Sequence, residues 1–154
     1  MAEHRFSDPI LEAIRHTPHI CLAEGLRSAT RAISKRYAAH LGGVTGPAQM
    51  SLLMRLYYVG PTPMAKLARH METDRTTLTR TVKLLADAGH VQVAVGEDRR
   101  ARVVRLTDRG FAALVEAVPL WQAAQAELRR DIGDGSWTSL LRETRRLATL
   151  DGTA

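Results

Sequence analysis

Hydroxyl and guanidinium groups are concentrated in one short segment near the middle of the sequence. Threonine hydroxyls hydrogen-bond to phosphates or base edges, and arginine can bind guanine through two parallel hydrogen bonds. On a helix, these polar side chains would lie opposite the apolar Leu78, Val82 and Leu85. A merely solvated helix would more often carry Glu and Lys pairs than the five threonines found between Thr73 and Thr81. The residues of this segment that we expect to contact DNA are Thr73, Arg75, Thr76, Thr77, Thr79, Arg80 and Lys83.

A second basic cluster follows at Arg99 and Arg100, within a polar turn that begins at Gly96. Arginines at the tip of a hairpin can reach phosphates or a narrow minor groove, where the negative potential is enhanced. Asp98 alone would repel DNA, so we expect it to orient a neighbouring arginine through a salt bridge. The alternative interpretation is an ordinary surface turn with a local ion pair.

The single cysteine, Cys21, excludes an intramolecular disulfide and a cysteine-rich zinc site. It could be a small buried apolar residue, a reactive thiol, or a link to a second copy of the chain. As a nucleophile it would need His19 as its base, but residues two apart on a helix do not share a face. No glycine-rich phosphate loop is present, and the histidines show no metal-site spacing. We therefore expect no enzymatic activity, no cofactor and no metal.

The elements that would position the threonine and arginine side chains can be read from apolar spacing and from Gly and Pro signals. Residues 18–41 have helical spacing, and Pro47 begins a second helix that stops at Gly60. Thr62 predicts a cap with Pro63 as the first residue of a third helix. Thr73 is the expected N-terminal cap of a fourth helix, which ends near residue 89. Residues 62–89 thus read as helix, tight turn, helix.

The period then changes, because Val91, Val93 and Val95 alternate with less apolar residues and predict a strand. Residues 102–106 predict its partner in a β-hairpin. Thr107 is the expected cap of a long helix, and a loop over residues 131–136 precedes a last one. Helix-turn-helix followed by a hairpin is a winged-helix pattern. We therefore predict a mainly α fold with a small β-hairpin wing: one chain, 1–154, with a DNA-binding part at 45–110 and helical parts at 8–44 and 111–152.

Composition agrees with a globular chain of 154 residues and 45% hydrophobic content. No apolar run approaches the roughly 20 residues of a membrane span, and no signal peptide is readable, so a cytoplasmic protein is expected. The net charge is +6, and residues 62–110 hold ten basic and six acidic side chains. This basic surplus favours a polyanionic partner.

At these residues the sequence resembles the MarR family of transcriptional regulators. The resemblance lies in residues 63–70 (PMAKLARH), 74–80 (DRTTLTR), 96–100 (GEDRR) and 104–110 (VRLTDRG), and the flanking helices also fit it. It implies a homodimer whose terminal helices pack across a two-fold axis. The two winged helices would then bind half-sites of a DNA palindrome about one helical turn apart. By the family pattern, Arg100 enters the minor groove and Asp98 holds it.

The resemblance also implies a switch. Family members are usually repressors that release DNA when a small, often aromatic ligand binds between the dimerisation helices and the winged helix. Some instead sense oxidants through a cysteine in the first helix, and Cys21 resembles that cysteine. Those members also have two tyrosines near the thiol. Here one of the two is absent, and the other is displaced to Tyr37 or lost. A winged helix that binds another protein is disfavoured, because the threonine- and arginine-rich helix face has no apolar anchor residues of the kind found in protein interfaces. The residues that could line a ligand pocket are His19, Cys21, Arg27, Tyr57 and Trp121.

Overall fold

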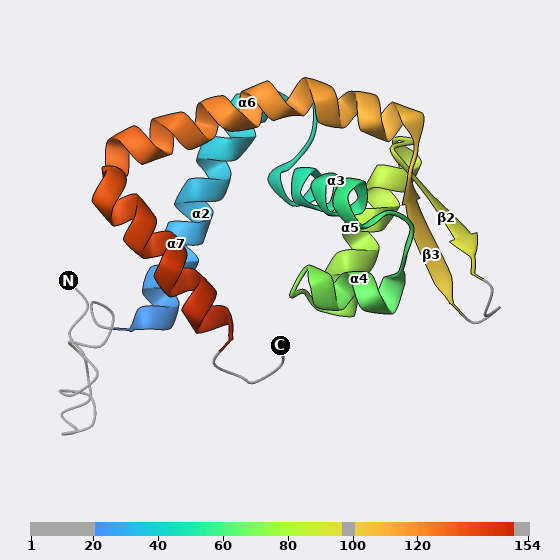
Figure 1. Cartoon of the computed structure of the whole chain (residues 1–154), viewed down its shortest axis with the longest axis horizontal. Helices are drawn as coiled ribbons and strands as arrows, with labels where there is room; N and C mark the ends of the chain where they lie inside the picture. The colour runs from blue at the N-terminus through green and yellow to red at the C-terminus, as the bar shows by residue number, and fades with distance from the viewer. Residues whose placement is uncertain (1–20, 97–100, 150–154) are drawn as a thin grey trace, which may run out of the picture. The chain divides into compact units, whose positions relative to one another are not determined.

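Helices dominate the computed structural model, which describes residues 21–96 and 101–149 (Figure 1). The chain divides into two compact units, Met1–Arg36 and Tyr37–Ala154. Helix α2 (Leu22–Leu41) is the described part of the first unit and continues into the second. The predicted mainly α fold with a small β wing is confirmed. The remaining elements, all in the second unit, are α3 (Pro47–Val59), β1 (Thr62–Pro63), α4 (Met64–His70), α5 (Arg75–Asp87), β2 (Val91–Val95), β3 (Arg102–Leu106), α6 (Asp108–Ile132) and α7 (Asp134–Ala148).

Within the first unit, helix α2 exposes its apolar seam. Leu22 is 61% exposed, and Leu26 and Ile33 are also exposed. On the polar side, Glu24 accepts hydrogen bonds from Arg27 and Arg31. Exposed ion pairs of this kind contribute little stability, about 0–1 kcal/mol each. The helix therefore presents apolar surface that the described part of this chain leaves uncovered.

The core of the second unit lies between α3, α4, α5 and a three-stranded sheet. Leu52, Leu53, Leu67 and Val104 are completely buried within it. Burying one such side chain stabilises the fold by about 1.5–3 kcal/mol. The strands lie in the order β1-β3-β2 and are antiparallel. This core fixes α5 against the sheet and leaves its other face outward.

Thr62 and Pro63 form the edge strand β1, so the predicted helix cap is wrong. Thr62 pairs with Val104, and its hydroxyl donates to the carbonyl oxygen of Gly60 at 3.0 Å. Pro63 is tolerated because an edge strand has one side without a ladder partner. Helix α4 then begins at Met64. A strand pairing of two residues with a segment some 40 positions away has no local sequence signal.

Helix α6 begins with a tightly packed turn. The Thr107 hydroxyl accepts the backbone N–H of Gly110 at 3.0 Å, as predicted for the cap. The same hydroxyl lies 2.7 Å from the carbonyl oxygen of Gly89 and 3.0 Å from that of His90. Gly110 is buried where α6 meets the chain entering β2. Through these contacts Thr107 joins the start of α6 to the segment between α5 and β2.

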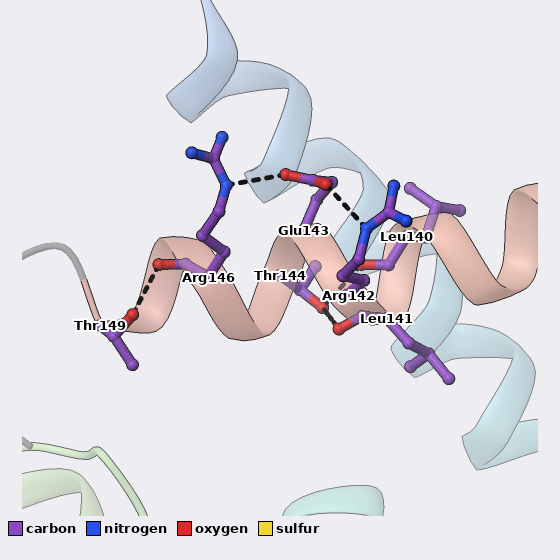
Figure 2. Close-up of polar contacts among 7 residues, drawn as sticks. All are labelled: Leu140, Leu141, Arg142, Glu143, Thr144, Arg146 and Thr149. Atoms are coloured by element: carbon purple, nitrogen blue, oxygen red, sulfur yellow. Dashed lines mark hydrogen bonds and ion pairs between the residues drawn. The ribbon is translucent and has the colours of Figure 1, made fainter.

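Only Gly133 separates α6 from α7, so the predicted loop over residues 131–136 is wrong. Helix α7 has no buried residue, and Leu140 and Leu141 are exposed. Figure 2 shows Glu143 between Arg142 and Arg146, with which it forms ion pairs. Hydrogen bonds from Arg146 and then Arg142 lower the pKa of Glu143. No described helix is long and apolar enough to cross a membrane.

Candidate DNA interface

Helix α5 separates an apolar inner face from a polar outer face. Leu78, Val82 and Leu85 are buried in the core. The outer face exposes Arg75 and Arg80, neither of which forms an ion pair with any described residue. The predicted contact residues on this helix (Arg75, Thr76, Thr77, Thr79, Arg80 and Lys83) are all exposed. Two exposed guanidinium groups on α5 are therefore available for an anionic partner.

The other predicted contacts on α5 are partly engaged within the helix itself. The Thr79 hydroxyl donates to the carbonyl oxygen of Arg75 at 2.7 Å, so it offers its lone pairs as an acceptor. The Lys83 ammonium lies 3.2 Å from the Asp87 carboxylate, one turn further along. Both groups are exposed, and such a pair is weak enough to exchange partners. The two arginines are therefore the strongest donors on this face.

Asp74, and not Thr73, caps the N-terminus of α5. The Asp74 carboxylate accepts the backbone N–H of Thr77 at 2.9 Å. Thr73 is half-buried, and its backbone N–H donates to the carbonyl oxygen of Ala68 in the preceding turn. The chain reverses at Glu72, whose φ is +47°. Both Asp and Thr are good caps, so the sequence did not distinguish two neighbouring candidates.

The charge state of Asp74 should control the stability of the recognition helix. Hydrogen bonding by the Thr77 side chain, and then by its backbone N–H, holds the pKa of Asp74 below its ordinary value. A lowered folded-state pKa contributes stability above the unfolded value of about 4, and this is lost as the pH falls through the folded value. We expect Asp74→Asn to lower the melting temperature at pH 7, and we expect this deficit to shrink as the pH falls below about 4. Thermal unfolding monitored by circular dichroism would measure this, and a deficit independent of pH would contradict it.

The wing is described as far as Gly96 and from residue 101 onwards. Beyond the Val95–Arg102 pair, the Gly96 N–H donates a hydrogen bond of 2.8 Å to the carbonyl oxygen of Ala101 at the start of the turn. Asp98, Arg99 and Arg100 lie outside the described residues, so their roles remain predictions. Arg102, opposite Val95 in the hairpin, is exposed and was not among the predicted contacts. Its position directly after the basic turn at Arg99 and Arg100 is the sequence feature that could have predicted a DNA contact.

The five predicted pocket residues fall in different parts of the structure. Tyr57 is 55% exposed and stacks on Phe111 with ring centroids 5.7 Å apart. Trp121 is half-buried against the core of the same unit. Cys21 is exposed and Arg27 pairs with Glu24, both in the first unit, whereas His19 lies outside the described residues. Among the described residues, no group of three His, Cys, Asp or Glu side chains could hold a metal ion.

Comparisons with known proteins agree with this architecture. The sequence model of the MarR family matches residues 46–101, which run from the start of α3 to the wing. The structure is similar to the M. tuberculosis transcriptional regulator MosR, solved in complex with DNA, with a TM-score of 0.78 and 32% identity over 86% of this chain and 96% of that one. It has the same fold as an E. coli MarR variant solved with operator DNA, with a TM-score of 0.76 and 19% identity over 86% and 96% of the two chains.

A curated relative is named as the uncharacterized HTH-type transcriptional regulator YwoH of Bacillus subtilis (strain 168). It is 37% identical over 59 residues, which are 38% of this chain and 43% of the relative's length. The match to MosR, by contrast, covers nearly all of both chains at more than 30% identity. The winged helix, the family match and the structural likeness lead to one conclusion: the chain belongs to the MarR family of winged helix-turn-helix transcriptional regulators.

Proposed function

We propose that this protein is a homodimeric repressor that binds a palindromic DNA operator and releases it when a small ligand binds. The observation that carries the proposal is the outer face of α5, where exposed Arg75 and Arg80 form no ion pair with described residues. The N-terminal half of such a helix contacts base edges in the major groove. MosR, at 32% identity, was solved in complex with DNA, which supports the same partner for this chain.

Uncovered apolar surface supports the homodimer. Leu22 and Leu26 on α2, and Leu140 and Leu141 on α7, are all exposed in the single chain. Leucines repeating along amphipathic helices are best buried against another helix. A two-fold dimer would present two copies of α5, so its operator should be a palindrome with half-sites about one helical turn apart. The exposed, stacked Tyr57 and Phe111 rings offer flat apolar surface for a small aromatic ligand.

The direct test is fluorescence anisotropy of the purified protein on duplexes that tile the region upstream of its own gene. We expect tight binding to one palindromic tile, with an affinity that falls steeply as salt rises because phosphate contacts release counterions. A panel of small aromatic acids then identifies ligands that release the operator. Equal weak binding to every tile and to random duplex would contradict sequence-specific regulation and favour an architectural role.

Arg100→Ala tests the wing. If the guanidinium enters the minor groove, its loss should weaken operator binding by about tenfold, corresponding to about 1.4 kcal/mol. Arg145→Ala is the matched control, since it removes the same charge from an exposed position on α7. Gel-shift titration of both variants on the operator measures the effect. An Arg100→Ala protein that binds as tightly as the control would remove the wing from the interface.

A thiol switch is the second candidate function, and the exposure of Cys21 directly before α2 favours it. An exposed thiol is accessible to an oxidant, which can convert it to a sulfenic acid. We expect organic hydroperoxide to release the operator from wild type and not from Cys21→Ser, while both bind equally when reduced. The measurement is operator anisotropy before and after oxidant. If wild type ignores the oxidant, the thiol does not act as the switch.

A further inference from the structure

The threonines of α5 differ in what their hydroxyl groups still offer to a partner. The Thr79 hydroxyl donates to the carbonyl oxygen of Arg75, one turn earlier, with an oxygen–oxygen distance of 2.7 Å. This is the usual length of a hydrogen bond between a hydroxyl and an oxygen acceptor. A hydroxyl has one hydrogen to donate and two lone pairs that accept. Since the hydrogen of Thr79 is engaged within the helix, its exposed side chain presents lone pairs alone.

The neighbouring threonines are arranged differently. Thr81 makes the same bond, to the carbonyl oxygen of Thr77 at 3.1 Å, but Thr81 is half-buried. The Thr77 side chain is exposed and hydrogen-bonds to Asp74, so it belongs to the cap of the helix. The exposed Thr76 hydroxyl has no hydrogen bond with a described residue and keeps its hydrogen for a partner. Among the described threonines of α5, Thr79 alone combines an exposed side chain with a hydroxyl hydrogen committed to the helix backbone.

A group that only accepts hydrogen bonds is selective among the parts of a DNA duplex. Phosphate oxygens also only accept, so Thr79 has no hydrogen to give them while its bond to Arg75 persists. In the major groove, guanine and thymine present only acceptors, whereas cytosine presents the amino group N4 and adenine the amino group N6. A lone pair placed against the oxygen of guanine or thymine is repelled. The Thr79 oxygen therefore fits a base with an exocyclic amino group.

The position of Thr79 on α5 suits such a contact. It is the fifth residue of the helix, within the half of a recognition helix that contacts base edges. Residues four apart on a helix are neighbours, with Cβ atoms about 5–6 Å apart, so Thr79 lies next to Arg75. This separation corresponds to about one to two base pairs along a strand. Arg75 suits the two acceptors of guanine, and Thr79 suits an amino base close to it.

We propose that Thr79 reads an amino base, adenine or cytosine, on the strand that α5 contacts. Its oxygen accepts the amino hydrogen while its own hydrogen stays on the carbonyl oxygen of Arg75. A hydroxyl that donates is also polarised into a better acceptor. Every base pair holds one amino base, so reversing the pair places a keto oxygen against the Thr79 lone pairs. The inference rests on the proposed operator binding and assigns one position of each half-site to one side chain.

Selection from random duplexes first gives the operator of the wild-type protein. Fluorescence anisotropy then compares wild type with Thr79→Val, which keeps the shape of threonine without its hydroxyl, on operators with one base pair reversed at a time. We expect one position in each half-site at which reversal weakens wild-type binding about tenfold and Thr79→Val binding little. Thr79→Ser keeps the hydroxyl and should retain the preference.

Removing the amino group alone tests the acceptor role directly. At the position that depends on Thr79, purine in place of adenine, or 2-pyrimidinone in place of cytosine, deletes the amino group and keeps the ring. We expect this change to weaken wild-type binding about as much as Thr79→Val does, with no further loss when the two are combined. Thr81→Val is the matched control, because it deletes a half-buried hydroxyl with the same bond and should leave every preference unchanged.

The outcomes separate this inference from the proposed function. Binding without any sequence preference would overturn both. A selected operator with the same preferences for wild type and Thr79→Val would overturn the role of Thr79 and leave the proposed function standing. Equal losses for Thr79→Val on operator and random duplex would assign the hydroxyl to a phosphate. A position that depends on Thr79 and prefers guanine or thymine would show that the hydroxyl donates, and either of these last results overturns the acceptor assignment.

Discussion

Gly110→Ala is expected to destabilise the protein by at least about 3 kcal/mol, a large part of the 5–15 kcal/mol typical of a whole domain. A Cβ atom at this position would lie 1.9 Å from the carbonyl oxygen of His90 and 2.9 Å from a methyl group of Leu106. The His90 carbonyl cannot move freely, since it accepts the Thr107 N–H at 3.1 Å and lies 3.0 Å from the Thr107 hydroxyl. Relief of the clash must therefore disturb the cap of α6 or the start of β2.

Chemical denaturation of Gly110→Ala and wild type measures this loss. Gly135→Ala is the control, because a Cβ there meets nothing within 4 Å and the residue lies inside α7. Alanine is a better helix former than glycine, and Gly135 lies in the first turn of α7, so the control should be at least as stable as wild type. A Gly110→Ala protein as stable as wild type would mean that α6 does not pack this closely on the chain at His90.

Local signals in the sequence were sufficient for most of the helices and for the hairpin. Pro47 and Gly60 bound α3 as predicted, because each residue type acts on its own backbone. The Thr107 cap was likewise predictable, since cap and helix are adjacent. The valines of β2 alternate with less apolar residues, a two-residue hydrophobic period that fits a strand and not a helix.

Features that depend on distant parts of the chain were missed. Thr62 looks like a helix cap locally, but pairing with Val104 places it in a strand. The need for glycine at position 110 arises only from the approach of His90. The outer face of α5 was predictable because one helix carries it.

Arg75→Ala and Arg80→Ala are expected to cause the largest losses of DNA affinity on α5, about 1–3 kcal/mol each, or about 5- to 150-fold. Both side chains are exposed, and neither forms an ion pair with a described residue. Both guanidinium groups are therefore available to contact DNA. Arg75 is the first residue of the helix, and Arg80 follows it about one and a half turns later. Lys83→Ala is the control from the same helix: its ammonium already pairs with Asp87 at 3.2 Å, so its removal should cost less.

The measurement compares each variant on the operator and on random duplex at two salt concentrations. An arginine that reads a base should lose affinity for the operator and little for random DNA, because random sites lack its base partner. An arginine that contacts phosphate should lose affinity for both equally, and the salt slope should become shallower by about 1. Arg75 and Arg80 lie in successive turns of α5. A base contact by one and a phosphate contact by the other would therefore be compatible with a helix in the major groove. Unchanged operator affinity for both would exclude this face of α5 from the DNA interface.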